Sequence, residues 1–183
     1  MLEFLKYLSQ LLVSPDKGWE DISHAGKPYD RLATEGLYPL LGIAAVTVFL
    51  GYFYDNDFTL IQLLQKAIIM FVKFFVTYFL AGAIFIIFVP KMVGGELNEK
   101  KSHTFIIYNV AMLALFAIIE NCMPLQLAFI KFLPLYSAIL IWKGARYLGV
   151  NSESVLEFSI LGVASIIIPP FLFSWIFNAI MPS

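Results

Sequence analysis

The chain has 183 residues, of which 60% are hydrophobic and 14% are charged, and its mean hydropathy is +0.82. A water-soluble globular domain could not bury that much apolar surface, so this class is excluded. The formal net charge of -1 argues against a nucleic-acid binder, which needs a basic face. The single cysteine, Cys122, allows neither an internal disulfide nor a thiolate metal cluster. The composition therefore predicts an integral membrane protein.

Residues 1–35 form the only long segment outside the predicted spans, and we expect it to lie at the cytoplasmic face. Its first apolar side chains share one helical face, while the polar side chains lie mostly on the other. This pattern predicts an amphipathic helix in the membrane interface rather than a signal peptide, because Glu3 and Lys6 interrupt the apolar part. The apolar face consists of Leu2, Leu5, Leu8 and Leu12, flanked by Phe4 and Leu11.

A second short helix is predicted to begin at Ser14-Pro15-Asp16. Serine suits the N-cap, proline suits the first helical position, and the aspartate complements the positive end of the helix dipole. Pro15, Trp19 and Ile22 then share one face. Two interpretations are open: Trp19 anchors the helix among the lipid headgroups, or the face is a docking motif for a partner.

Hydropathy over windows of about 19 residues predicts five membrane spans within a domain of residues 36–183. They cover approximately residues 37–54, 60–89, 103–119, 125–148 and 155–181. The second is the longest, since thirty residues of helix rise about 45 Å against a hydrocarbon core of roughly 30 Å. The expected fold class is thus all-α, a polytopic five-helix transmembrane bundle with an N-terminal interfacial segment.

Local signals support these boundaries. Thr59 with Gln62, and Ser154 with Glu157, have the spacing of capping boxes at helix starts. Gly149, like the Gly94-Gly95 pair, suits a left-handed cap at a helix end.

The basic residues predict the orientation of the spans. Nine of the twelve lysines and arginines fall on one side of the membrane, in residues 1–36, in the loop after the second span and at the end of the fourth. The other three lie within spans, so the opposite side has none. This positive-inside pattern places the N-terminus in the cytoplasm and the C-terminus outside.

Two segments resemble a known family. Residues 14–22, SPDKGWEDI, followed by five closely spaced spans, are similar to the bacterial branch of the Yip (Ypt-interacting protein) family, and so are residues 135–149 at the end of the fourth span. Eukaryotic members associate with each other and with prenylated Rab-type GTPases in vesicle traffic. The resemblance implies a location in the cytoplasmic membrane of a bacterium. Since bacteria lack those GTPases, it implies no Rab-type partner here, and it supplies no catalytic residues.

The second span carries the polar residues most suited to a functional site. Gln62, Lys66, Lys73 and Thr77 fall on one stripe, which we call the polar seam. Lys73 lies about 20 Å along the helix, and a lysine at that depth costs about 2.5 to 3.5 kcal/mol on insertion scales. Two interpretations of Lys73 are open: it is part of a functional site, or it has only a structural role in the bundle.

We rank the expected ion-pair and hydrogen-bond partners of these lysines by their depth in the membrane. Glu120, at the outer end of the third span, is expected to pair with Lys131 or Lys66, while Lys73 has no acid at its own level. For Lys73 the expected hydrogen-bond partners are Asn109, Tyr108 or a carbonyl freed by Pro134, which is expected to kink the fourth span.

Pro169 and Pro170 are expected to kink the fifth span, because they remove two amide donors. The small residues before them favour close helix packing, with a gate or ligand pocket as the second interpretation.

No enzymatic motif is present: the sequence lacks HExxH, GxSxG, a Walker-type loop and an acidic metal cluster. We therefore expect a non-enzymatic protein without cofactor or metal that organises the membrane or partner proteins, interacting with lipid, other membrane proteins or itself. Two alternatives are a transporter of small solutes, ions or lipid through the polar seam, and an accessory subunit of a membrane complex.

Overall fold

The structure, a computed structural model, describes residues 1–54, 59–94, 98–123 and 132–180. Within these ranges the secondary structure is helical, apart from one isolated antiparallel bridge between Val93 and Val150. The α-helices are α1 (Leu2–Val13), α2 (Pro15–Ala25), α3 (Tyr29–Leu32), α4 (Tyr38–Thr47), α5 (Gly51–Tyr54), α6 (Leu60–Phe88), α7 (Glu99–Cys122), α8 (Leu133–Leu148), α9 (Val155–Gly162) and α10 (Ile168–Ile180). Short 3-10 turns lie at Val48–Leu50, Val89–Lys91 and Ser152–Ser154, and π-helical turns lie at Ala33–Leu37 and Val163–Ile167.

Four continuous helices in the described residues are long and apolar enough to cross a bilayer. They are Tyr29–Leu50, Leu60–Lys91, Glu99–Cys122 and Ser152–Ile180, with 22, 32, 24 and 29 residues. The all-helical architecture of a multi-pass membrane protein is thus confirmed. The fourth expected span, 125–148, is described only from residue 132 onward, and its helix α8 has 16 residues.

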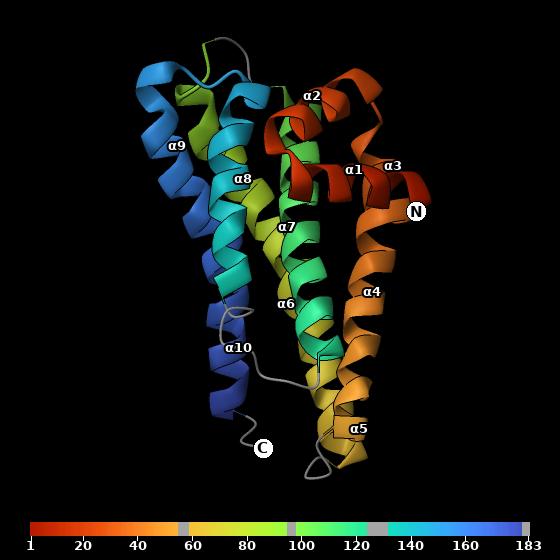
Figure 1. The fold of residues 1–183 in the computed structure, drawn as a ribbon. Helices are drawn as coiled ribbons and strands as arrows, with labels where there is room; N and C mark the ends of the chain where they lie inside the picture. The colour runs from red at the N-terminus through yellow and green to blue at the C-terminus, as the bar shows by residue number, and fades with distance from the viewer. Residues whose placement is uncertain (55–58, 95–97, 124–131, 181–183) are drawn as a thin grey trace.

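Helix α7 is the centre of the bundle, with α4 on one side and α8 on the other (Figure 1). In its most apolar stretch 67% of the residues are buried, compared with 33% in Ser152–Ile180. The side chains that α7 buries are mostly large and apolar, so they form a core that all the other long helices share. The outer helices, by contrast, present wide apolar faces outward, as lipid-facing helices do.

Local signals correctly predicted some helix ends. Thr59 and Gln62 form the expected capping box: the Gln62 amide donates to Thr59 Oγ1 over 3.3 Å, and the Thr59 amide donates to Gln62 Oε1 over 2.8 Å. Gly149 ends α8 at φ 74°, as expected. The prediction at Ser154 was wrong, because a 3-10 turn precedes α9 there and its side chain makes no capping hydrogen bond.

The prolines act differently from the expected kinks. Pro134 lies in the first turn of α8, where a missing N–H has no intrahelical acceptor to lose, so it begins the described helix rather than kinking it. Before Pro169 and Pro170 the helix widens into the π-helical turn Val163–Ile167, in which the Ile168 amide reaches Val163 O. The wider turn accommodates the two missing donors within a continuous helix.

The N-terminal segment packs on the bundle more closely than an interfacial helix would. Helices α1 and α2 lie across one end of the bundle (Figure 1), and Phe4, Leu8 and Leu11 of α1 are buried in the core. The Phe4 ring fits against the π-helical turn at Gly36, where an added Cβ would lie 2.5 Å from the ring. The first spanning helix begins at Tyr29, so the expected boundary at residue 36 falls inside it.

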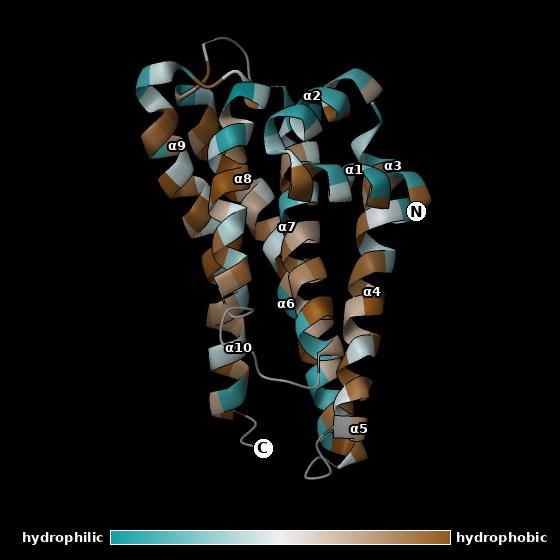
Figure 2. Ribbon diagram, viewed as in Figure 1, coloured by the Kyte–Doolittle hydropathy of each residue, from teal (hydrophilic) through white to brown (hydrophobic). Residues whose placement is uncertain are grey.

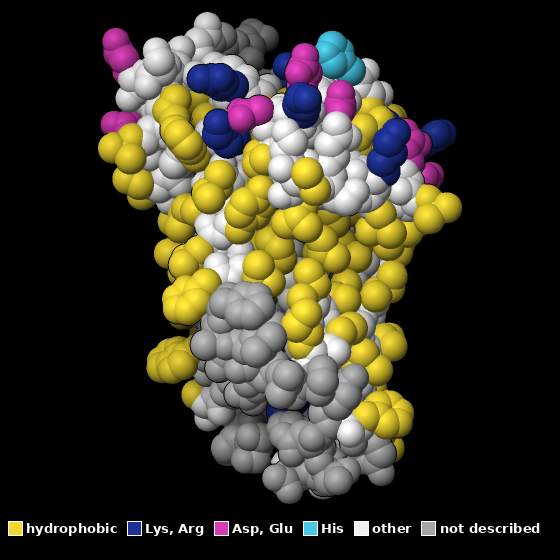
Figure 3. All heavy atoms as spheres, viewed as in Figure 1, with side chains coloured by type: hydrophobic (Ala, Val, Ile, Leu, Met, Phe, Trp, Pro, Cys, Tyr) yellow, Lys and Arg dark blue, Asp and Glu magenta, His cyan; other side chains and the backbone are white. Residues whose placement is uncertain are grey.

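Charge and apolar surface separate along the bundle axis. Most of the charged side chains visible in Figure 3, and the visible histidine, lie at the end covered by α1 and α2, above a broad apolar belt that also appears in Figure 2. We call this the charged end: it comprises α1, α2, the start of α7 and the end of α8. The same end carries the segments in which the positive-inside pattern was found.

We predict that Gly144→Ala destabilises the protein, whereas Gly42→Ala does not. A Cβ at Gly144 would lie 2.4 Å from Phe105, whose ring is held between other aromatic rings, while a Cβ at Gly42 meets nothing within 4 Å. Overpacking should cost about 1 to 3 kcal/mol, and alanine at position 42 should gain up to about 1 kcal/mol in helix propensity. Thermal unfolding in detergent measures both, and equal melting temperatures would contradict this packing.

Candidate functional site

Lys73, the deepest lysine of the polar seam, lines a small cavity between α6, α7, α8 and α10. The cavity has a volume of about 60 Å³, and its walls are largely apolar. The Lys73 Nζ donates to Ser174 Oγ of α10 over 3.4 Å, and that hydroxyl donates in turn to Pro170 O over 2.9 Å. A space of this size holds one or two water molecules and is far below the few hundred Å³ of a small-molecule site.

Glu120 lies on the wall of this same cavity, which the sequence analysis did not anticipate. Its carboxylate attracts the Lys73 ammonium electrostatically. The expectation that Lys73 has no acid near its level was therefore wrong, because the C-terminal end of α7 lies beside the middle of α6. Lys66 is half-buried on α6 and does not line the cavity, and the third expected partner, Lys131, lies outside the described residues.

The remaining residues of the expected site form local contacts instead of a continuous polar path. Gln62 caps its own helix. Thr77 is fully buried, and its hydroxyl donates to Lys73 O over 2.6 Å. Asn109 is also buried and donates to Phe105 O over 2.9 Å, while its Oδ1 has no hydrogen-bond partner among the described residues.

Aromatic packing closes the seam toward the charged end. Beyond Thr77, helix α6 buries Tyr78 and Phe85, and the Phe85 ring lies 5.6 Å from Phe105 and 5.8 Å from Phe158. These rings fill the space between α6, α7 and α9, and beside them the Tyr78 hydroxyl lies 3.4 Å from His103 Nδ1 in the first turns of α7.

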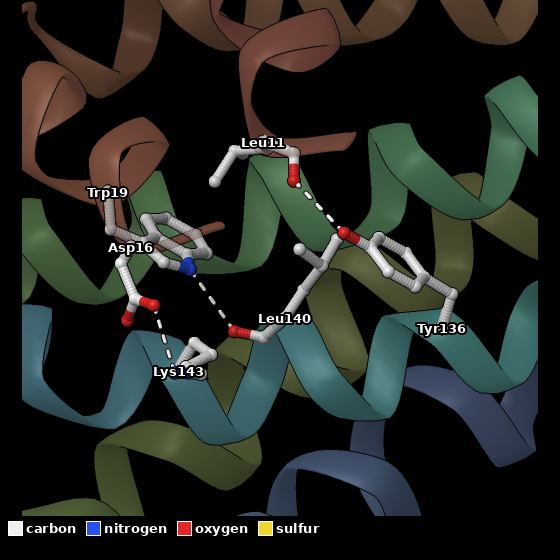
Figure 4. Close-up of polar contacts among 6 residues, drawn as sticks. All are labelled: Leu11, Asp16, Trp19, Tyr136, Leu140 and Lys143. Atoms are coloured by element: carbon white, nitrogen blue, oxygen red, sulfur yellow. Dashed lines mark hydrogen bonds and ion pairs between the residues drawn. The ribbon is translucent and has the colours of Figure 1, made fainter. Parts of the chain in front are cut away.

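Trp19 fixes the N-terminal segment to the bundle. Its side chain is 3% exposed, and its rings stack on Phe105 and Tyr147 at 5.2 Å each. The indole Nε1 donates to Leu140 O over 3.1 Å (Figure 4). Both earlier interpretations of this face, a headgroup anchor and an external docking motif, are therefore corrected for Trp19, which binds within its own chain.

The other two residues of that expected motif support the same contact. Ile22 is buried beside Trp19 in the core, and Pro15 opens α2 at the first turn as predicted. Gly144 makes room for the indole, because a Cβ there would lie 3.0 Å from Trp19 Cε2.

Two further contacts join the N-terminal segment to the same face of α8. Tyr136 Oη donates to Leu12 O over 2.8 Å and, more weakly, to Leu11 O over 3.5 Å, and Lys143 Nζ pairs with Asp16 Oδ2 at 2.9 Å. Figure 4 shows the contacts with Leu11 and Asp16. With Leu140 between them, these α8 residues recur at intervals of four and three, which is one helical face. The sequence analysis missed this face, although a tyrosine and a lysine at that spacing beside a helix glycine could have suggested it.

The geometry thus defines an all-helical, multi-pass membrane protein with its N-terminal segment docked on one end. Comparison of the chain with protein-family models, with curated proteins and with solved structures gives no match in any of the three. The resemblance to the Yip family therefore remains a prediction from residues 14–22 and 135–149.

We predict that Trp19→Phe releases the N-terminal segment. The change removes the hydrogen bond to Leu140 O and part of a buried ring, which should cost about 2 kcal/mol. Limited proteolysis should cut within residues 1–28 faster than in the unchanged protein, with a lower melting temperature. The matched control is Trp142→Phe on α8, where the side chain is 54% exposed, and it should change neither measurement. Equal proteolysis of both variants would contradict the docking role of Trp19.

Proposed function

We propose that this chain is a non-enzymatic, Yip-like membrane protein that organises partner proteins or copies of itself in the bilayer. The observation that carries the proposal is the closed bundle: aromatic rings fill its interior and its own N-terminal segment covers the charged end. A closed interior leaves the outer apolar faces as the surface through which the protein acts.

Those outer faces are extensive. In the most apolar stretch of Leu60–Lys91 only 39% of the residues are buried, and in Ser152–Ile180 only 33%. Large apolar side chains project from both helices, including Ile68, Phe79 and Trp175. Lipid covers such a face well, and so does the helix of another membrane protein.

We propose five spans with the charged end in the cytoplasm. Helix α10 ends at the opposite end of the bundle from α1 and α2 (Figure 1), as an odd number of crossings requires. The four long helices alone would give an even number of crossings. Helix α8, which runs back to the charged end, supplies the fifth. The basic residues at that end favour the cytoplasm of a bacterial cell.

Thiol labelling in intact cells tests this topology. The native Cys122 is exposed at the end of α7 remote from the charged end, so an impermeant maleimide should label it from outside. In the double variant Cys122→Ser, Lys100→Cys, we expect labelling only after the cells are made permeable. Labelling of position 100 in intact cells would show that the orientation is the reverse of the proposed one.

Photo-crosslinking from inside the membrane tests the organising role. A photoreactive amino acid at Trp175 or Ile68, both exposed, should capture a protein partner or a second copy in native membranes. The same group at Ile107, which is fully buried in α7, is the control and should give no intermolecular product. Crosslinks to lipid alone from both exposed positions would overturn the proposal.

The second candidate is transport, which the Lys73 and Glu120 cavity favours, since ionisable residues inside a membrane often mark an ion pathway. Under the organising role, Lys73→Leu should insert and fold normally, because the change removes an insertion cost of about 2.5 to 3.5 kcal/mol. Proteoliposomes should show no flux of protons, Na⁺ or K⁺ above that of empty vesicles, with or without the change. A flux that Lys73→Leu abolishes would establish transport instead.

A further inference from the structure

A second, larger cavity lies at the charged end and takes no part in the proposed organising role. Its volume is about 420 Å³, within the range of small-molecule sites. The end of α2, the connection into α3, the first turns of α7 and Tyr147 of α8 form its walls.

The rim of this cavity carries an excess of positive charge. Lys27, Lys100 and Lys101 line it, against one acidic residue, Asp30, among the described lining residues. Lys27 pairs with Glu3, and Lys101 Nζ lies 5.6 Å from the centre of the Tyr147 ring. Lys100 is exposed and makes no ion pair with a described residue. The start of the 24-residue helix α7 adds its positive dipole end at the same rim.

The wall below the rim provides hydroxyl groups. Lys100, Thr104 and Tyr108 follow one another at intervals of four on α7, so they line one face that descends about 12 Å into the bundle. Tyr29 and Tyr147 add two further phenol rings to the walls. The cavity therefore has cations at its mouth and hydroxyl groups below them.

Tyr108 is the residue that points to a ligand. Its side chain is 1% exposed, yet its hydroxyl has no hydrogen-bond partner among the described residues. The ring is held by stacking on Phe4 at 4.9 Å and by edge contact with Trp19 at 6.4 Å. Tyr108 lines this cavity and a neighbouring one of about 150 Å³, and it does not line the Lys73 cavity where the sequence analysis expected it. The hydroxyl is not among the fully buried polar atoms that lack a partner, so it is accessible from the cavity and can hydrogen-bond a ligand group there.

We infer that this cavity binds a phosphate ester with a small hydroxylated body, such as glycerol phosphate. Lys100 and Lys101, which make no ion pair with a described residue, match a phosphate better than a single carboxylate, and the tyrosine and threonine hydroxyls suit the body of the ester. The same chemistry is present in a free phosphate ester and in a phospholipid headgroup. The inference stands apart from the organising role, since it concerns the cytoplasmic rim and not the outer faces.

Calorimetry on the full chain in neutral detergent tests the inference with glycerol phosphate as the probe. We expect saturable binding that Tyr108→Phe weakens about tenfold, because one hydrogen bond to a hydroxyl of the ester is lost while both ring contacts stay. The double variant Lys100→Gln, Lys101→Gln should weaken binding at least as much. Lys91→Gln is the matched control: Lys91 is exposed near the same end but does not line the cavity, so its change should have no effect.

Nanodiscs distinguish the two sources of the phosphate ester. Native mass spectrometry in phosphatidylcholine containing some phosphatidylglycerol should detect retained phosphatidylglycerol if the ligand is a headgroup, with the same loss in the Tyr108 and lysine variants. Variant-dependent binding of glycerol phosphate alone identifies a free ester, and either result supports the site. Binding of neither probe by the unchanged protein overturns the inference, and so does an equal loss in Lys91→Gln. If Tyr108→Phe does not fold, the double variant Lys100→Gln, Lys101→Gln still tests the site, because both lysines are exposed.

Discussion

The docking of Trp19 is the interaction on which the rest of this structure depends. The indole lies between Phe105 of α7 and Tyr147 of α8, donates to Leu140 O, and needs the absence of a side chain at Gly144. One buried ring thereby joins the N-terminal segment to the two helices that organise the core. It also touches Tyr108, so the same contact shapes the cavity at the charged end.

Two polar regions lie at different levels of the bundle, and packed aromatic rings lie between them. At the charged end, lysines and tyrosines surround a cavity of about 420 Å³, whereas the space beside Lys73 has about 60 Å³. Between them lies a layer of phenylalanine rings from α6, α7 and α9. Such a rigid layer lies between the Lys73 region and the charged end, while Glu120 is exposed near the C-terminal end of α7. A scaffold benefits from that rigidity, while a pathway would require the rings to move.

Much of the fold follows from the sequence because its signals are local. The apolar runs fix where the four long helices lie, and the Thr59 and Gln62 capping box and Gly149 fix two of their ends. Less of the candidate site could be predicted from the sequence. Trp19 has the same helical position whether it faces lipid, a partner or its own bundle, and only the packing of α2 on α8 chooses among them. The Ser154 box failed for a similar reason, since the chain enters α9 through a 3-10 turn.

By itself, the sequence determined that this protein is an all-helical membrane protein with its basic residues gathered toward one end, because bilayer insertion depends on the length and apolarity of each segment. The tertiary structure alone decided that Trp19 is buried, that Glu120 lies beside the Lys73 cavity, and that Tyr108 belongs to the charged end. Each of these contacts joins helices distant in the sequence. Their partners depend on how the helices are rotated and offset against one another, which no local pattern encodes.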